Sequence, residues 1–520
     1  MPALFYAPAL QSSSRLLPCC WPWLLACWLS LSFPALAQPA EAARLPEEVR
    51  QALHEAHIPF TEVAVIVQPV DDAQHPTLQL NGERPLNPAS LMKLLTTYAA
   101  LELLGPAYTW HTTLLTERLP QDGVLNSDLI LRGTGDPALT LERFWLLLHR
   151  LRARGVRDLQ GNLILDRHIF DSAGIEAERH PPFDDQPLRP YNVLPDALLL
   201  NFKAINLQLA GDPAQGTLTL LPEPLPANLD IINQITPAPP IPDNLRPGLC
   251  LQWKKDLQAD YQPAKTGSGS ESSSRARLVL KGHYPIDCGS QVWRLAPQTH
   301  PEYLQGVFTQ LWYELGGTLR GTVANRTLPP DSALTVLADV ESPPLASIVR
   351  DLNKFSNNVM ARQLFLALGQ KAEPPPDGRG LRPQDGARAI RQWLARKPLN
   401  FPELVLDNGA GLSRQERLSA ASLARLLDSA WQSPVMPEFV SALSIAGVDG
   451  TLKKRLAGEP LVGRSRLKTG SLDGVSGLAG YLLDQRGHWQ IVVFLVNHPN
   501  AANSHAVQDA LLRWVYRAAE

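Results

Sequence analysis

Three short motifs in this chain hold the residue types that acyl transfer requires. In chain order they are Ser90–Lys93 (S-L-M-K), Ser356–Asn358 (S-N-N) and Lys468–Gly470 (K-T-G). The first supplies a hydroxyl nucleophile and an amine that can accept its proton. The second supplies another hydroxyl with an amide, and the third a cation that can hold a carboxylate. Together they predict a serine nucleophile that acts on a substrate with a free carboxylate.

Two segments match the Ser-x-x-Lys pattern, and their expected secondary structure separates them. Ser90 opens the apolar segment 91–104, which ends at a Gly-Pro pair and is typical of a helix. Residues i and i+3 share one face of a helix, so the Lys93 amine can reach the Ser90 hydroxyl. Ser465 lies in a strand-like segment, where i and i+3 point to opposite faces. The pair Ser465 and Lys468 is therefore a chance match.

The Lys-Thr-Gly sequence also occurs twice, and the neighbouring residues distinguish the copies. Residues 265–267 lead into the Gly/Ser-rich stretch 268–274, which is typical of a solvated loop. Residues 468–470 precede two apolar stretches, 477–483 and 489–496, that are typical of buried strands. A lysine at the edge of such a sheet has the rigid support that catalysis requires. We therefore assign the functional motif to residues 468–470.

Ser356 has a simpler structural explanation, which its residue type alone would favour. The segments 345–353 and 359–368 are typical of two helices joined near Ser356. A serine at that junction is an ordinary N-cap for the second helix and requires no catalytic role. Its place between the other two motifs favours the catalytic interpretation.

Composition and charge limit the classes of protein that the chain can represent. Its 520 residues are sufficient for two or three domains, and 44% of them are apolar. The 47 prolines therefore indicate ordered connections rather than disorder. The net charge is −2, without a basic run or interleaved aromatic and basic residues, so nothing indicates binding to nucleic acid.

The N-terminal residues are typical of an export signal. Arg15 precedes the apolar stretch 16–36, and small residues at its end predict cleavage near Ala37. A lipidated leader that ends at Cys27 and an uncleaved anchor are the alternatives. No later stretch is long and apolar enough to span a membrane. We expect residues 1–37 to be a signal peptide and the folded part to be exported to the periplasm.

Export changes the interpretation of the cysteines. Of five cysteines, only Cys250 and Cys288 lie outside the export signal. In an oxidising compartment, two cysteines most simply form one disulfide. The alternative is two unpaired buried thiols.

Metal-dependent chemistry has little support in the sequence. Segment 54–57 (H-E-A-H) is one residue shorter than the zinc-protease pattern H-E-x-x-H, and it falls in a polar helix that we expect at the surface. The other histidines form no ligand cluster along the chain. Residue counts leave a Ser-His-Asp hydrolase open, but there is no G-x-S-x-G elbow. We expect neither a metal nor a cofactor.

These motifs, with several segments between them, give the chain a resemblance to a known family. It resembles the class C low-molecular-mass penicillin-binding proteins, the exported D-alanyl-D-alanine carboxypeptidase/endopeptidases similar to penicillin-binding protein 4. The resemblance covers essentially the whole mature chain. The matching segments are Asn87–Lys93, Arg132–Pro137, Tyr191–Leu198, Asp407–Arg414 (with Ala410 where the family usually has Ser) and Lys468–Leu472.

The resemblance implies an α+β fold. Its centre would be a penicillin-binding transpeptidase/β-lactamase-like domain, an antiparallel sheet flanked by helices plus a helical subdomain. A large nested insertion rich in β structure would account for the long chain between Lys93 and Ser356. We expect the parts to be residues 45–107 and 328–520 for the catalytic domain, 108–200 and 289–327 for the inserted domain, and 201–288 for a nested β-rich module that carries both cysteines.

The resemblance also implies the chemical role of each motif. Ser90 would attack the carbonyl between two D-alanines of a peptidoglycan stem peptide, and Lys93 would accept its proton. Ser356 would pass a proton to the leaving amine, and Asn358 would bind the substrate backbone. β-Lactam antibiotics would acylate Ser90 in the same way but leave slowly.

The third motif would hold the substrate. Lys468 and Thr469 would bind its terminal carboxylate, and Gly470 would let it pair along the strand edge. The backbone N–H groups of Ser90 and Ser471 would form the oxyanion hole.

An acidic turn gives one further expected contact. In the family, a tryptophan-aspartate loop contacts the diamino-acid side chain of the substrate. The nearest segment here is Phe183, Asp184 and Asp185, with Phe183 where tryptophan is expected. An exposed acidic turn without a binding role is the alternative.

Two other functional classes are compatible with these residues. A serine β-lactamase would share Ser90, Lys93 and Lys468, although the large insertion argues against it. A catalytically silent peptidoglycan-binding scaffold is the third class, although the intact motifs argue against a dead site.

The C-terminal segment 504–518 is typical of an amphipathic helix. We expect its apolar residues to pack on the sheet. Peripheral membrane association through the same residues is the alternative.

Overall fold

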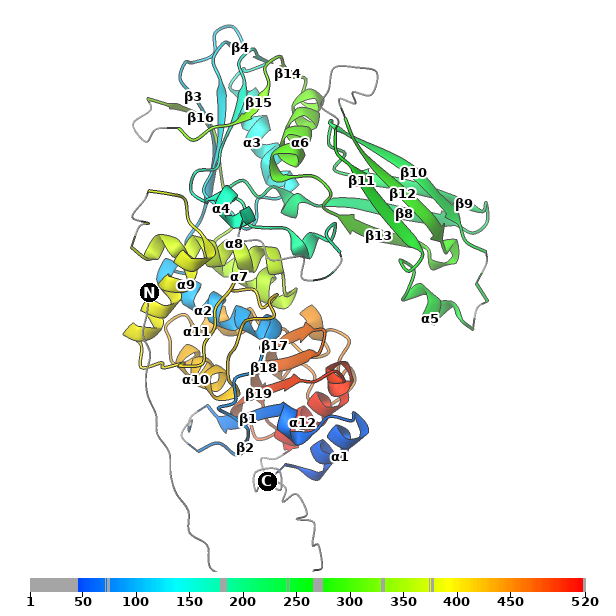
Figure 1. Cartoon of the computed structure of the whole chain (residues 1–520), viewed down its shortest axis with the longest axis vertical. Helices are drawn as coiled ribbons and strands as arrows, with labels where there is room; N and C mark the ends of the chain where they lie inside the picture. The colour runs from blue at the N-terminus through cyan, green and yellow to red at the C-terminus, as the bar shows by residue number, and fades with distance from the viewer. Residues whose placement is uncertain are drawn as a thin grey trace, which may run out of the picture.

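The computed structural model describes residues 45–517, apart from 71, 73–74, 178–183, 185, 240, 243, 265–274, 329–332, 374 and 376–377. The predicted signal peptide and the predicted loop at 268–274 lie outside the described residues. Figure 1 shows a main part, an inserted part that continues along the long axis, and a nested module that projects to one side of the inserted part.

The main part is built on a five-stranded sheet of order β17-β18-β19-β1-β2. β1 pairs antiparallel with β19 along its whole length, from Val63 opposite Val496 to Pro69 opposite Gln490. Both strands are rich in valine because both faces of this sheet are covered. The bounds are β1 Val63–Pro69, β2 Leu78–Leu80, β17 Ser465–Leu472, β18 Val475–Leu483 and β19 Trp489–Asn497, which confirms the strands expected at 477–483 and 489–496.

Two helices that are far apart in the sequence cover one face of this sheet. α1 (Glu47–Glu55) lies against α12 (His505–Arg517), and both share a core with the strands. Val507, Leu511 and Leu512 of α12 are fully buried in that core. The expected packing of the C-terminal helix on the sheet is therefore confirmed.

A group of helices covers the other face and surrounds α2 (Met92–Leu104). α2 is buried on all sides from Met92 to Leu101, as expected for a helix that is apolar around its whole circumference. The surrounding helices pack against α2 and fix its position. The helices of this group are α7 Leu345–Lys354, α8 Asn358–Leu368, α9 Pro383–Arg396, α10 Ala420–Trp431 and α11 Met436–Ser441.

The inserted part has a second five-stranded sheet, of order β15-β7-β5-β3-β16, and a small sheet, β14-β6-β4. β16 pairs with β3, from Thr335 opposite Thr116 to Glu341 opposite His111. This strand follows residue 328, so the boundary predicted there is too early by the length of one strand. The elements are β3 His111–Thr116, β4 Val124–Leu125, β5 Leu129–Gly133, α3 Leu141–Ala153, β6 Asp158–Leu159, β7 Leu163–Asp166, α4 Ser172–Ala177, α6 His300–Glu314, β14 Thr318–Leu319, β15 Val323–Asn325 and β16 Thr335–Glu341.

The nested module consists of two three-stranded sheets, β13-β8-β9 and β10-β12-β11. β13 pairs with β8, so the module extends past the boundary predicted at residue 288. The predicted disulfide between Cys250 and Cys288 is present and joins the end of α5 to the turn before β13. The elements are β8 Ile205–Asp212, β9 Thr217–Glu223, β10 Leu229–Pro237, α5 Arg246–Cys250, β11 Leu257–Gln262, β12 Ala276–Tyr284 and β13 Ser290–Leu295.

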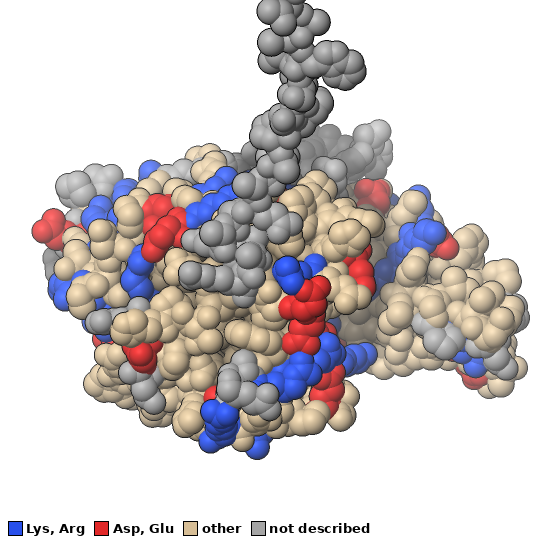
Figure 2. All heavy atoms as spheres, turned by 90° about the horizontal axis from the view of Figure 1, so that it is seen from below, with Lys and Arg blue, Asp and Glu red and all other residues tan. Residues whose placement is uncertain are grey.

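The surface agrees with the balanced composition of the chain. Lysine, arginine, aspartate and glutamate are intermixed over the face shown in Figure 2, without a large area of one sign. Within the part of the chain that the structure describes, no helix combines the length and the apolar character needed to cross a membrane.

We expect the disulfide to stabilise the nested module and to leave the main part unaffected. Replacing Cys250→Ala and Cys288→Ala removes a covalent link across 38 residues. A closed loop of this length is worth about 4 kcal/mol in the chain-entropy model. Limited proteolysis during a thermal ramp should show earlier cleavage within residues 205–295, with unchanged cleavage of the main part. Equal protection of the module in the variant and the wild type would contradict this expectation.

Candidate active site

Ser90 lies in a strained turn directly before α2. The 3₁₀ turn Ala89–Leu91 leads into the helix, and Asn87 fixes its geometry. The Asn87 side-chain oxygen accepts a hydrogen bond from Ala89 N (2.9 Å), and its amide donates to Ser413 O (2.7 Å). Ala89 has φ +46°, a left-handed conformation that costs a non-glycine residue about 1–3 kcal/mol. The turn holds Ser90 half-buried at the start of α2.

The Lys93 amine faces the Ser90 hydroxyl, as the helical spacing predicts. Lys93 Nζ lies 2.8 Å from Ser90 Oγ and 2.7 Å from Asn358 Oδ1, and it also donates to Ala410 O. A neutral amine has two N–H groups, and the two carbonyl acceptors can take both. The remaining lone pair then points to the Ser90 hydroxyl. This is the arrangement that a general base requires.

The pKa of Lys93 lies well below the ordinary lysine value. Burial of the amine is the main cause, and the charge of Lys468 lowers the pKa further. Glu416 opposes this effect. The side chain is fully buried, so water cannot compensate for its charge. Burial and the charge of Lys468 both favour the neutral amine, which is the form that can accept a proton.

Ser356 lies between α7 and α8 but does not cap α8. The N-cap is Asn357, whose side-chain oxygen accepts hydrogen bonds from Val359 N (3.0 Å) and Met360 N (3.1 Å). The N-cap explanation of Ser356 is therefore wrong. Ser356 has φ +55°, and its Oγ accepts a hydrogen bond of 2.8 Å from Lys468 Nζ. A second strained residue thus directs its hydroxyl into the site.

Lys468 links the third motif to the second. Besides Ser356, its amine donates to Thr469 O at 2.7 Å. Burial lowers the pKa of Lys468 to about 7. The site therefore contains two fully buried amines, those of Lys93 and Lys468, behind two half-buried hydroxyls.

Gly470 lets β17 pass directly beside the Ser90 turn. A Cβ atom at position 470 would lie 2.8 Å from Pro88 O and 3.2 Å from Ser90 N. Because only glycine permits this approach, β17 runs along the turn, and Ser471 is the next residue of the strand. The two backbone N–H groups expected for an oxyanion hole thus belong to adjacent segments.

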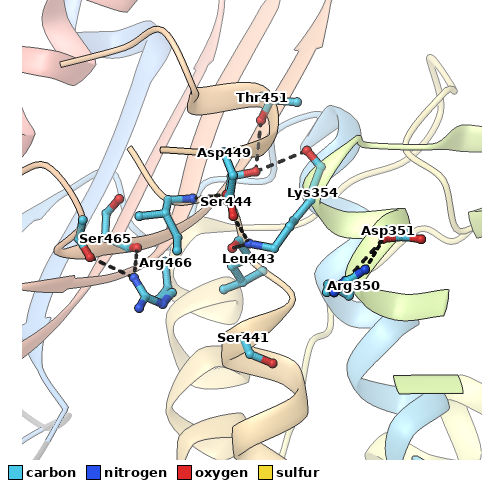
Figure 3. A network of polar contacts seen from close by, with 12 residues as sticks. Arg350, Asp351, Lys354, Ser441, Leu443, Ser444, Asp449, Thr451, Ser465 and Arg466 are labelled. Atoms are coloured by element: carbon cyan, nitrogen blue, oxygen red, sulfur yellow. Dashed lines mark hydrogen bonds and ion pairs between the residues drawn. The ribbon is translucent and has the colours of Figure 1, made fainter. Parts of the chain in front are cut away.

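A polar network connects the second and third motifs behind the site (Figure 3). Lys354 Nζ, at the end of α7, lies 2.6 Å from Asp449 Oδ2. Ser444 donates to Lys354 O and forms a β-bridge with Leu467 of β17. Thr469 donates to Thr451 at 2.8 Å. No sequence pattern indicates this network, because Lys354 and Asp449 are 95 positions apart and share no motif.

Glu416 anchors the loop that supplies the Ala410 carbonyl. Glu416 Oε1 accepts hydrogen bonds from Asn408 N (3.1 Å) and Gly409 N (3.0 Å), and Thr96 of α2 donates to Gly409 O (2.7 Å). Glu416 is fully buried, and burial raises its pKa to about 7. No motif in the sequence identifies this residue. The one indication in the sequence is that Glu416 lies shortly after the segment Asp407–Arg414, which resembles the family and contains Ala410.

The expected side-chain contact is only partly covered by the structure, since Phe183 and Asp185 lie outside the described residues. Asp184 accepts hydrogen bonds from Tyr191 Oη and from Asn192 Nδ2 (2.8 Å). Among the described residues, none of the hydrogen bonds of Asp184 reaches the three motifs. Its contact with substrate stays a prediction.

Comparisons with known proteins identify the family of the chain. The model of the D-Ala-D-Ala carboxypeptidase 3 (S13) family matches residues 45–518. The D-alanyl-D-alanine carboxypeptidase of Actinomadura sp. (strain R39) is 29% identical over 489 residues, which cover 92% of this chain and 86% of the relative. The D-alanyl-D-alanine carboxypeptidase DacB of Haemophilus influenzae is 26% identical over 420 residues, or 80% of this chain and 81% of the relative.

The fold also agrees with a solved structure. The crystal structure of penicillin binding protein 4 from Haemophilus influenzae matches with a TM-score of 0.70 and 24% identity, over 90% of this chain and 99% of that chain. The expected α+β fold of the penicillin-binding type is confirmed.

The lowered pKa of Lys468 predicts that kcat/KM depends on pH. The carboxylate-binding role that the sequence predicts for Lys468 would require its cationic form, which predominates only below a pKa of about 7. We expect kcat/KM for a D-Ala-D-Ala peptide to fall about ten-fold for each pH unit above that pKa. Lys468→Arg keeps its charge at all these pH values, so it should lack the alkaline decline. A decline at the same pH in both enzymes would assign it to another group.

At position 411, the addition of one methyl group should disturb the turn that holds the nucleophile. A Cβ atom there would lie 1.9 Å from Ala89 O, and Gly411 has φ +78°. Gly411→Ala should lower stability by about 2–4 kcal/mol and slow acylation of Ser90, because backbone strain and overpacking add. The matched control is Gly458→Ala, which has φ +84° and no neighbour within 4 Å. Chemical unfolding and acylation rates should separate the variants, and equal losses would contradict the assignment.

Proposed function

The chain belongs to the D-Ala-D-Ala carboxypeptidase 3 (S13) family, and from this premise we propose that Ser90 is the residue acylated by peptidoglycan stem peptides. The observation that carries the proposal is the 2.8 Å contact between Lys93 Nζ and Ser90 Oγ, with two further acceptors on the same amine. The protein is a serine-type D-Ala-D-Ala carboxypeptidase, and its own geometry suggests how each step proceeds.

Acylation begins with proton transfer from Ser90 to neutral Lys93. Ser90 Oγ attacks the carbonyl carbon between the two D-alanines, and negative charge develops on the carbonyl oxygen. We infer that the backbone N–H groups of Ser90 and Ser471 stabilise it, an interaction worth about 3–4 kcal/mol per donor in a serine protease. Gly470 supports this role, since it brings β17 against the Ser90 turn.

Departure of the terminal D-alanine requires a proton on its amine nitrogen. Ser356 is a half-buried hydroxyl of the site, and Lys468 donates a hydrogen bond of 2.8 Å to its Oγ. We assign to Ser356 the relay of a proton to the leaving nitrogen; Ser356 regains a proton at the expense of the one that Lys93 took from Ser90, so Lys93 returns to its neutral form. Water then hydrolyses the acyl-enzyme and releases the shortened peptide.

The substrate would add to the exposed edge of β17. Ser444 bridges that edge at Leu467, and the motif residues follow directly after the bridge. Lys468 and Thr469 would hold the terminal carboxylate. Asn358 Oδ1 is already bound to Lys93, which leaves the Asn358 amide group to donate to a substrate carbonyl.

The same site suits cross-links and β-lactams. In a cross-link the leaving amine belongs to a diamino acid with a carboxylate beside it, so endopeptidase activity would use the same residues. A solved penicillin binding protein 4 is complexed with a β-lactam. We expect β-lactams to acylate Ser90 here, and we expect the enzyme to act in the periplasm on peptidoglycan.

Family membership favours this function over a β-lactamase or a catalytically silent scaffold. The buried amine beside Ser90 also argues against a dead site, because burial of Lys93 is costly without a use for its neutral form.

The test is intact-protein mass after incubation with benzylpenicillin. We expect one stable adduct on the wild type and none on Ser90→Ala, because Ser90 is the hydroxyl that the neutral amine of Lys93 faces. Ser465→Ala, which changes the other Ser-x-x-Lys match, is the control and should acylate normally. Consumption of penicillin without an adduct would favour a β-lactamase. Neither an adduct nor consumption would reject the catalytic assignment.

A further inference from the structure

A groove outside the Ser90 site lies where the nested module meets the segment after Asp184. Its volume is about 720 Å³. Residues 186–189 form one part of its lining, and residues 251–255 line it together with Leu257, Ala259 and two residues of β13, Trp293 and Leu295. Ala296 N donates to Leu188 O at 2.8 Å, which ties residues 186–189 to the module. None of its lining residues belongs to the three motifs, so this groove is separate from the site at α2 and β17.

Cationic side chains gather at the groove. Arg189, Lys254 and Lys255 line it. None of the three forms an ion pair with a carboxylate in the described part of the chain; Arg189 donates instead to Gln186 Oε1 at 2.7 Å. The pKa of Lys254 is lowered by burial and by the charges of Arg189 and Arg294. These charges repel one another, and an anionic ligand would relieve that repulsion.

Aromatic rings lie beside these cations. Trp253 and Trp293 both line the groove. Lys254 Nζ lies 4.8 Å from the centroid of the Trp253 ring, and that ring packs edge-on against Tyr284 at 5.8 Å. Trp293 is only 5% exposed and is held rigidly in the module core. Fixed rings next to cations suit a ligand with an apolar face and acidic groups.

We propose that this groove binds an acidic stretch of a peptidoglycan strand, away from the peptide bond that is cleaved at Ser90. Peptidoglycan combines sugar rings, amides and free carboxylates, which match the tryptophans, Gln186 and the cations of the groove. The inference rests on the function proposed above, because it assigns a second contact with the same polymer.

The chain connects the groove directly to the active site. Arg189 is followed by the turn Pro190–Asn192, which packs on α8. Arg362 of α8 donates to Tyr191 O at 3.4 Å, and Asn358 is the first residue of the same helix. A strand held at both places would keep its stem peptides at high local concentration near Ser90. A short soluble peptide would gain nothing from the groove.

The experiment compares polymer binding with peptide hydrolysis in the full mature chain. The groove variant is Arg189→Gln with Lys254→Gln and Lys255→Gln. The control is Lys371→Gln with Arg391→Gln and Arg396→Gln, which removes three exposed cations from the helical part of the molecule. Each protein is sedimented with purified insoluble peptidoglycan and assayed on a short D-Ala-D-Ala peptide.

We expect the groove variant to bind peptidoglycan at least about five-fold more weakly than the wild type. Its peptide hydrolysis and its acylation by benzylpenicillin should be unchanged, which also shows that it is folded. The control should bind as the wild type does. Lys254→Arg with Lys255→Arg should retain binding, since the charge is kept.

Other outcomes overturn the proposal. Equal sedimentation of the groove variant and the wild type would show that the groove is not a peptidoglycan site. An equal loss in the control would show attraction by net charge alone. Loss of binding to phosphatidylglycerol vesicles, with peptidoglycan binding intact, would identify a membrane as the occupant. A wild type that neither hydrolyses peptide nor reacts with benzylpenicillin rejects the proposed function instead, while sedimentation still reports on the groove.

Discussion

The burial of two lysine amines in one small site is the constraint on which the rest of the structure depends. Lys93 and Lys468 are both fully buried; burial lowers the pKa of each, and the charge of Lys468 lowers the pKa of Lys93 further. Such a pair can easily hold one proton but not two. One amine is then free to act as a base while the other remains a cation. The buried carboxyl group of Glu416 moderates this balance, because its charge raises the pKa of Lys93.

The surrounding elements keep the two amines apart and directed at different hydroxyls. α2 is enclosed by other helices, so Lys93 cannot turn towards solvent. The Ala410 carbonyl and the Asn358 side chain, which come from a loop and from α8, fix its direction. Lys468 is fixed by an edge strand and by Ser356. The site is thus assembled from four separate segments, and the sheet and helices supply the rigidity that none of them has alone.

The sequence predicted the parts of this site that rest on local geometry. Ser90 and Lys93 could be paired because helical spacing places them on one face, and the correct Lys-Thr-Gly could be chosen from the apolar strands after it. Local pattern could not decide which residue at the α7–α8 junction caps α8, since serine and asparagine are both good caps. It also could not find Glu416 or the Lys354–Asp449 pair, which depend on contacts between distant segments. The strands β13 and β16 crossed the predicted boundaries for the same reason: their pairing partners lie far away in the sequence.

The pairing of β1 with β19 has a consequence for the order of folding. These strands are neighbours in the sheet, yet the register joins Val63 to Val496. Closing so long a loop is slow, and β1 has no partner on that side until the residues after 489 are available. The nested module and the inserted part have shorter-range contacts and can fold first. The Ser90 turn, which packs against β17 and β18, would therefore become ordered last, so a partly folded chain would have no working nucleophile.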